Sequence, residues 1–242
     1  MSDLTILSLL PALLNVNGDA ENAAVLAQRS RWSGHSASVV SLGLDDSTPS
    51  AAPSVVVIGS TTDVALPTVL AALHGHRAAL LDWIAAGVPV VAIGTGWEVL
   101  GRTIELATGT IDGLGILPSS AVTAPTRVTD DLVVESAFGR LIGFENHARD
   151  TVLDGGASPI GRVLYGRGNG AGSTAEGLLA GSVIASHLHG PVLAKNPGLA
   201  DHVLTAAIGP GYDARTVMAG RVDDIAKAAR NVIATRLELG AE

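Results

Sequence analysis

A run of apolar residues that ends in glycines contains the first candidate for chemistry in this chain. Residues 90–101 read VVAIGTGWEVLG, which predicts a strand, a sharp turn and the start of a helix. This is the shape of a nucleophile elbow, in which a strained backbone lifts one side chain above a sheet. The apex residue, Gly94, has no side chain, and Thr95 follows it. From these residues alone, an ordinary glycine-containing turn is the simpler interpretation.

Two histidines in a later loop are candidates for a general base. His187 and His189 follow the apolar run at residues 183–186 and precede Gly190 and Pro191. Alternation along a strand would put both imidazoles on one face, so a metal pair is one alternative. The spacing marks no third ligand. We therefore prefer one functional and one packed histidine, and we predict no metal site.

Two further segments combine glycines with polar residues. Residues 143–147 read GFENH and residues 165–170 read YGRGNG. Polar side chains directly after an apolar strand are typical of a site rim or a partner surface. A hydrogen-bonded turn is the alternative, and the residues alone favour it.

Composition excludes several function classes. The 242 residues include no cysteine, which excludes disulfides, thiolate catalysis and Cys-ligated zinc. The net charge of −8 disfavours binding to a phosphate backbone, so we expect no nucleic-acid partner. Residues 78–93 are apolar, but Asp82, Gly87 and Pro89 interrupt them, so we expect no membrane span. Residues 4–14 lack the basic start of a secretory signal, and a cytoplasmic protein is expected.

Apolar runs that alternate with helical patterns predict a doubly wound α/β fold. Such strands are typical of a mostly parallel sheet that helices cover on both faces. In the first half we predict strands at 4–10, 38–42, 54–58 and 88–93, and helices at 21–31, 67–81 and 97–107. Ligands bind these sheets beyond the carboxyl ends of the strands. The loops after Leu10, Ile58 and Ile93 are therefore the expected site.

The second half predicts short strands with glycine-rich connections. They cover residues 132–135, 141–144, 161–165 and 183–187, and we expect antiparallel additions to the sheet. Residues 47–54 and 121–125 are the best candidate loops, but neither is typical of a domain linker. We therefore predict one domain over residues 1–242. Near the C-terminus, apolar residues recur at the spacing of one helical face: Val222, Ile225, Ala226, Ala229, Val232 and Ile233.

Taken together, these segments resemble the GatD-type glutamine amidotransferase subunits of lipid II isoglutaminyl synthase. That family is related to the cobyric acid synthase type of amidotransferase. The resemblance begins with LNVNGD at residues 14–19, continues through residues 143–147 and ends with HGP at 189–191 and KNPGLAD at 195–201. It covers most of the chain in the right order. It implies the class I glutamine amidotransferase fold, which is flavodoxin-like.

The resemblance also assigns roles to individual residues. By resemblance, His189 is the catalytic base and Arg127 holds the glutamine substrate. Gly59 and Ser60 fall where backbone N–H groups would form an oxyanion hole. The position two residues after His189, where an orienting acid would stand, is Pro191, so the third member of a triad is unmarked.

The elbow departs from the family pattern. It reads roughly Cys-Gly-Gly-Tyr-Gln in the family and Gly-Thr-Gly-Trp-Glu here, starting at Gly94. Glycine offers no side chain that could attack an amide. Thr95 stands in the substrate site one residue past the apex, and we expect its hydroxyl to point away from His189.

Membership of this family implies a partner. The resemblance implies a complex with a Mur-ligase-like (MurT-type) subunit, which uses ATP and magnesium to amidate a lipid II-linked peptide at the inner face of the membrane. No cofactor is expected on this chain. Three hypotheses follow: a subunit without glutaminase activity whose partner takes ammonium or a small amine, a glutaminase with an unusual nucleophile, and a module that binds a small molecule or peptide. We choose the first.

Overall fold

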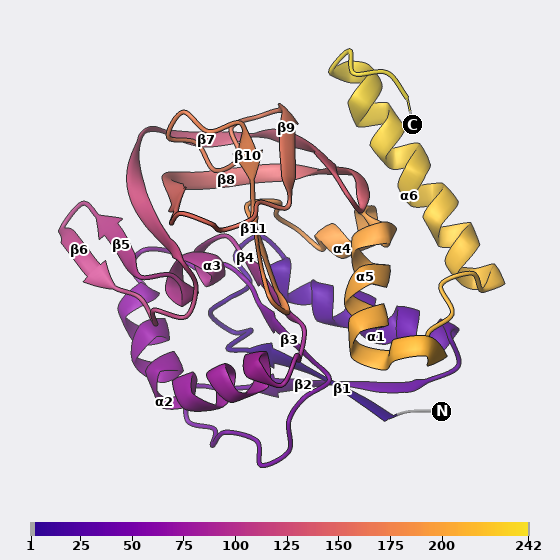
Figure 1. Ribbon diagram of the computed structural model, residues 1–242, viewed down its shortest axis with the longest axis horizontal. Coiled ribbons are helices and arrows are strands. Elements are labelled where there is room, and N and C mark those ends of the chain that lie inside the picture. The colour runs from indigo at the N-terminus through magenta and orange to yellow at the C-terminus, as the bar shows by residue number, and fades with distance from the viewer. Residues whose placement is uncertain (1–2, 242) are drawn as a thin grey trace.

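The fold is built on two sheets, seen in a computed structural model that describes residues 3–241. Sheet A has the strand order β11-β12-β4-β3-β1-β2, and sheet B has the order β10-β9-β7-β5-β6 with β8 paired to β7. Sheet B lies above sheet A in Figure 1. The predicted α/β class with a parallel sheet and antiparallel additions is confirmed.

Sheet A is parallel except at one edge. Its parallel strands are β1 (Asp3–Leu9), β2 (Ser36–Leu42), β3 (Val55–Ile58), β4 (Val90–Ile93) and β12 (Val183–Ser186), and only β11 (Leu178–Ala180) runs antiparallel. All residues of β3, β4 and β12 are buried. Continuous burial is expected because helices cover both faces of a parallel sheet.

Helices cover the two faces of sheet A unequally. Helix α2 (Leu66–Ala85) packs Val69, Leu70 and Leu73 into the core on one face. Helices α1 (Asn22–Trp32) and α5 (Pro197–Ile208) pack against the other face, where Leu26 and Val203 join the strand residues. The short elements are the 3-10 turns η1 (Asp19–Glu21) and η2 (Gly209–Gly211) and the helices α3 (Thr95–Leu100) and α4 (Val192–Lys195).

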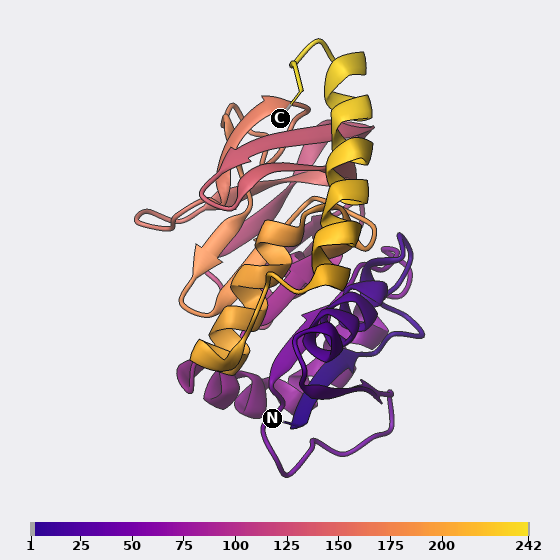
Figure 2. The same ribbon diagram turned by 90° about the vertical axis from the view of Figure 1, so that its right-hand side faces the viewer.

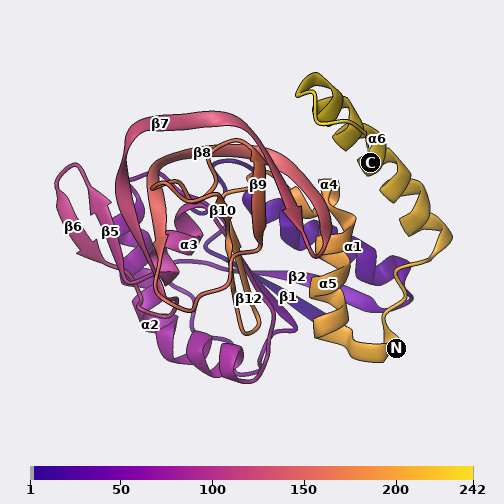
Figure 3. The same cartoon turned by 45° about the horizontal axis from the view of Figure 1, so that its top comes forward.

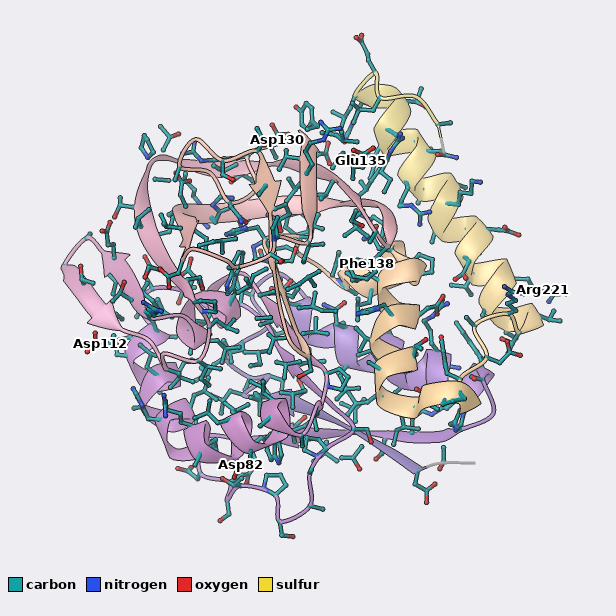
Figure 4. The ribbon with its side chains drawn as sticks, in the orientation of Figure 1. Asp82, Asp112, Asp130, Glu135, Phe138 and Arg221 are labelled. Carbon is teal, nitrogen blue, oxygen red and sulfur yellow. The ribbon has the colours of Figure 1, made fainter. Side chains whose placement is uncertain are left out.

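Sheet B is dominated by one long hairpin. Strands β7 (Ser119–Ser136) and β8 (Gly139–Leu153) pair antiparallel, with a register shift between Thr123 and Val128, and they curve over the molecule in Figure 3. The other strands are β5 (Thr103–Leu106), β6 (Gly109–Asp112), β9 (Gly161–Tyr165) and β10 (Ala175–Glu176). At the hairpin turn, the Phe138 ring packs on His202 of α5 with centroids 4.6 Å apart, which ties sheet B to a helix of sheet A (Figure 4).

Several sequence expectations are wrong in detail. The helix predicted over residues 97–107 ends at Leu100, and β5 follows because Thr103 and Ile104 pair with neighbours in sheet B. The loop predicted over residues 121–125 lies inside β7. The two short strands predicted at 132–135 and 141–144 are the central parts of the long hairpin.

The C-terminal helix α6 (Val217–Arg236) also departs from expectation. Of the six residues predicted to share one packed face, only Ala226 is buried, whereas Ile225 and Val232 are 69% and 71% exposed. Figure 2 shows why: α6 runs along the outside of the molecule and extends past the edge of sheet B. Within residues 3–241, no helix is both long enough and apolar enough to cross a membrane.

Candidate functional site

A strained turn joins β4 to α3 at the position that the sequence marks as an elbow. Gly94 has φ 54° and ψ −123°, a conformation that side-chain-bearing residues rarely adopt. Its N–H donates to the Ser186 carbonyl (2.9 Å), and its carbonyl accepts from the Trp97 N–H (2.9 Å). The backbone is therefore fixed from β12 on one side and from the first turn of α3 on the other.

The apex faces the imidazole of His189. A Cβ atom built on Gly94 would lie 2.4 Å from His189 Cε1 and 3.1 Å from His189 Nε2. His189 follows β12 and is held by its own N–H, which donates to the Phe144 carbonyl (2.8 Å). The structure thus brings together the two residues that the sequence linked across 95 positions of the chain. The imidazole occupies the space that an apex side chain would need.

A buried carboxylate that the sequence did not mark supports this imidazole. Asp19 Oδ2 lies 3.1 Å from His189 Nδ1, and both side chains are almost fully buried. The Asp19 carboxylate also accepts from the Gly190 N–H (2.8 Å) and from the Ser60 hydroxyl. A carboxylate at Nδ1 favours the tautomer with its proton there and leaves Nε2 as the basic nitrogen.

His189 Nε2 itself is buried and lacks a hydrogen-bond partner within residues 3–241. A buried polar atom without a partner costs free energy, and such an exception asks for an explanation. Here the explanation is local. The atom lies beside the apex of the elbow, where Gly94 carries no side chain that could bind it.

Most predicted site residues line one cavity of about 240 Å³. Gly94, Thr95, Ser60, Arg127 and His189 all contribute to its wall. The remaining wall is formed mainly by polar side chains: Val16, Asn17, Thr61, Thr62, Asp63, Glu98, Asn146, His147, Ala148 and Arg149. The site is therefore assembled from loops after β1, β3, β4 and β12 and from the inner hairpin of sheet B, as the strand-end rule expects.

Gly59, which was also predicted as a site residue, does not line this cavity. A Cβ atom there would come within 2.1 Å of the Leu14 carbonyl oxygen, so the position requires glycine for close backbone packing. The Ser60 side chain is engaged with Asp19 and accepts from Asn17 Nδ2 (3.0 Å). The oxyanion-hole role of Gly59 and Ser60 stays a prediction.

The hydroxyl of Thr95 is hydrogen-bonded to the loop after β3. Its Oγ1 accepts from the Thr61 N–H (2.6 Å) and lies 3.3 Å from the Thr61 carbonyl. These contacts turn the hydroxyl toward the β3 loop. Thr95 therefore positions that loop against the elbow.

Arg127 extends into the cavity from the irregular part of β7. Its Nε and Nη2 donate to Asn146 Oδ1 (3.1 and 2.7 Å), and Asn146 in turn donates to Asn17 Oδ1 (3.1 Å). Asn17 Nδ2 also lies 3.0 Å from His189 Nδ1, next to the carboxylate of Asp19. A guanidinium at one end and an imidazole at the other span the cavity, an arrangement suited to a ligand with a carboxylate and a polar side group.

A second arginine, Arg149, also lines the cavity. Arg149 donates to the buried Glu98 (2.9 Å from Nε) and to the exposed carboxylate of Asp63 (2.8 Å from Nη2). Burial raises the pKa of Glu98, and Arg149 offsets only part of that rise. The hydrogen bond from Arg149 lowers the pKa of Asp63. Arg149 therefore clamps the β3 loop onto α3.

The two remaining histidines differ in their surroundings. His147 lines the cavity and pairs with Glu145 (3.1 Å). Burial alone would lower the pKa of His147, but the hydrogen bonds to Glu145 and to the Arg149 carbonyl, together with the charges of Glu145 and Glu176, raise it. His187 packs between the rings of Trp97 and His147, with centroids 4.8 and 4.5 Å away, and pairs with Glu176. Among the described residues no group of His, Asp and Glu side chains could hold a metal ion.

Comparisons with known proteins show the family of this chain. A model of the CobB/CobQ-like glutamine amidotransferase domain matches residues 6–197. The chain is 31% identical over 209 residues to the lipid II isoglutaminyl synthase (glutamine-hydrolyzing) subunit GatD of Staphylococcus aureus, covering 86% of this chain and 85% of that protein. It is 28% identical to the corresponding subunit of Streptococcus pneumoniae, covering 86% and 82%.

More distant similarities point the same way. A cobyric acid synthase of Frankia casuarinae is 32% identical over 123 residues, or 48% of this chain and 21% of that protein. Two Thermotoga maritima structures share the fold: PurLQS (TM-score 0.57, 13% identity, 84% of this chain and 98% of that chain) and a glutamine amidotransferase (TM-score 0.52, 15% identity, 97% and 94%). The domain match alone covers more than three quarters of the sequence, and so the chain belongs to the CobB/CobQ-like glutamine amidotransferase family.

Proposed function

We propose that this chain is the amidotransferase-like subunit of a lipid II isoglutaminyl synthase-type complex and that it does not hydrolyse glutamine. One observation carries the proposal. The turn at the elbow faces His189, but the residue at its apex is Gly94, and the chain contains no cysteine. Without a nucleophile, no glutamyl intermediate can form on this chain.

The expected loss of glutaminase turnover follows from the way in which catalytic residues act together. Removing the nucleophile from a group of residues that act as a unit typically lowers turnover by about 10⁶. Thr95 is a poor replacement, because its hydroxyl is held by the backbone of Thr61. A threonine needs a base within hydrogen-bond reach to attack an amide, and His189, the base that the resemblance assigns, faces the apex.

The partner and the reaction come from the relatives. Two relatives that match over most of their length are GatD subunits of a lipid II isoglutaminyl synthase. By this similarity, a Mur-ligase-like subunit would bind this chain. That partner would bind ATP and magnesium and use ATP to activate a carboxylate of the lipid II-linked peptide. Its nitrogen would come from free ammonium or a small amine.

The decisive experiment combines the purified chain with its Mur-ligase-like partner. We expect a stable complex, no ammonia release from glutamine above background, and amidation of the lipid-linked peptide only when ammonium or a small amine is supplied. Glutamine-dependent ammonia release that disappears in His189→Ala would contradict the loss of glutaminase activity. Failure of the two proteins to associate would contradict the assignment as a ligase subunit.

The cavity also supports a narrower alternative, in which the chain binds an amino acid without cleaving it. Arg127 lines the cavity together with Asn146 and Asn17, and a carboxylate ligand would take over the hydrogen bonds that Arg127 makes to Asn146. Calorimetry with glutamine tests this alternative. Tight binding by the chain alone, abolished in Arg127→Ala, would favour a binding module over a ligase subunit.

A further inference from the structure

The outer edge of sheet A is unusually open. Strand β2 is the last strand of the sheet, and its only strand partner among the described residues is β1. Six of its seven residues are not buried, and Val39 and Val40, which point to opposite faces, are each 41% exposed. Neither face of this strand is therefore fully covered by helices.

Strand β2 also lacks the features that keep an edge from pairing. Its sequence, SASVVSL, contains no charged residue and no proline. Natural edge strands are usually protected by lysines, prolines, bulges or a covering element, because an uncharged edge is a template for another strand. The apolar surface continues beyond the strand to Leu44, which is 46% exposed.

Alternate backbone groups of β2 point outward along this edge, and the Arg31 side chain already binds one of them, the Ala37 carbonyl. The Leu42 carbonyl accepts from the Leu10 N–H, so it faces β1, and alternate residues of a parallel strand face opposite sides. The N–H and carbonyl of Val39 and Ser41 therefore point outward. The Arg31 side chain confirms the direction, because it reaches around the edge and donates to the Ala37 carbonyl.

Symmetry and charge identify the strand that would fit. In an antiparallel pair formed across a two-fold axis, Val39 meets Val39 of the other copy, and Ala37 meets Ser41. The Arg31 side chain releases the Ala37 carbonyl in this pair, and Ser41 of the other copy takes its place. The exposed Arg31 lies at the amino end of β2, and the exposed Asp45 and Asp46 follow its carboxyl end. Antiparallel pairing brings the basic end of each copy to the acidic end of the other, so the edge is self-complementary.

We propose that two copies of this chain associate through β2, which joins their A sheets into one continuous sheet across a two-fold axis. The interface consists of main-chain hydrogen bonds at Val39 and Ser41, apolar contacts of Val39 and Val40, and end-to-end attraction between Arg31 and Asp45. It is independent of the glutamine amidotransferase site and leaves the question of glutaminase activity untouched.

Light scattering after size exclusion tests the association over a range of concentrations. We expect a dimer for the natural chain. Val39→Lys places two lysines against each other at the axis and should raise the dimer dissociation constant at least about tenfold, equivalent to about 1.4 kcal/mol. Val232→Lys on α6, which is also exposed, is the matched control and should leave the dimer intact. A monomeric natural chain, or equal effects of the two lysines, would overturn the proposal.

A cross-linking variant tests the register without perturbing the fold. The chain has no cysteine, so Val39→Cys introduces its only thiol. Hydrogen-bonded antiparallel pairs have Cα atoms about 5.5 Å apart, which lies within the range of a disulfide. Mild oxidation should convert Val39→Cys to a covalent dimer and leave Val232→Cys as a monomer. Equal cross-linking of the two variants, or none at Val39→Cys, would refute pairing at this edge.

Discussion

The apex of the elbow combines two constraints that act on a single residue. Gly94 adopts a positive φ that glycine tolerates at little cost. The imidazole of His189 fills the space above it, close to where a Cβ would stand. A side chain at this position would therefore have to strain the backbone and displace a buried ring that Asp19 holds in place.

Gly94→Ala should lower the free energy of unfolding by about 1–3 kcal/mol, because both constraints are violated. The matched control is Gly87→Ala: that glycine has φ 84° but open space around its Cβ position. It should therefore show only the backbone part of the cost. Urea unfolding of the two variants measures the difference. Equal losses would mean that His189 moves aside freely.

At the scale of elements, a buried arginine connects three helices. Arg29 of α1 donates to Asp201 of α5 (2.6 Å) and to Asp223 of α6 (2.6 Å). Burial alone would lower the pKa of Arg29, but the two carboxylates outweigh burial and raise it. Tyr212 adds a hydrogen bond to Asp201 (2.5 Å). The fully buried apolar residues of α6 are alanines, and this polar contact attaches the first half of the helix, whereas Ile233 and Arg236 attach its second half to sheet B.

Asp223→Ala should therefore loosen α6 and lower the free energy of unfolding by about 1–3 kcal/mol, since Arg29 loses one of its partners. Hydrogen exchange should show faster exchange across residues 217–236 and little change in β3 and β4. Asp224→Ala is the control, because Asp224 is the exposed neighbour on the same helix. Unchanged exchange in Asp223→Ala would show that apolar contacts suffice to hold α6.

At the scale of the whole molecule, buried polar groups connect the two sheets. Glu176 of β10 accepts from the Ser186 hydroxyl (2.7 Å) and the His187 N–H (2.8 Å), at the carboxyl end of β12. Burial would raise the pKa of Glu176, but His187 and these hydrogen bonds hold it below its usual value of 4.5. A group with a lowered folded-state pKa stabilises the fold above its unfolded pKa, and this contribution is lost as the pH falls.

The stability difference between the natural chain and Glu176→Gln should therefore be constant above pH 4.5 and shrink as the pH falls below that value. Glutamine cannot titrate, so the variant lacks this part of the acid transition. Thermal unfolding across the acidic range measures the effect. Glu135→Gln removes an exposed ion pair with Arg162 and should give a small difference with little slope. A difference for Glu176→Gln that does not change with pH would contradict the argument.

The strands of sheet A could be predicted from the sequence more fully than the hairpin of sheet B. The apolar runs of β1, β3, β4 and β12 and the glycine turn at Gly94 are local patterns, and the structure places each of them as predicted. The hairpin of sheet B was predicted only in its centre. Residues 121–125 were expected to form a loop, but they lie inside β7, where Ala121, Val122 and Thr123 pair with β8.

The sequence by itself determined that the chain is an α/β protein and that the apex of its elbow is glycine, since both depend on residue type and short-range spacing. Only the tertiary structure decided that Asp19 supports His189, because 170 residues separate them and no spacing rule connects them. The tertiary structure also decided that the apolar residues of α6 are mostly exposed and that β2 lies at the open edge of sheet A. Whether an apolar face is buried depends on which elements pack against it, and the periodicity of one segment cannot contain that information.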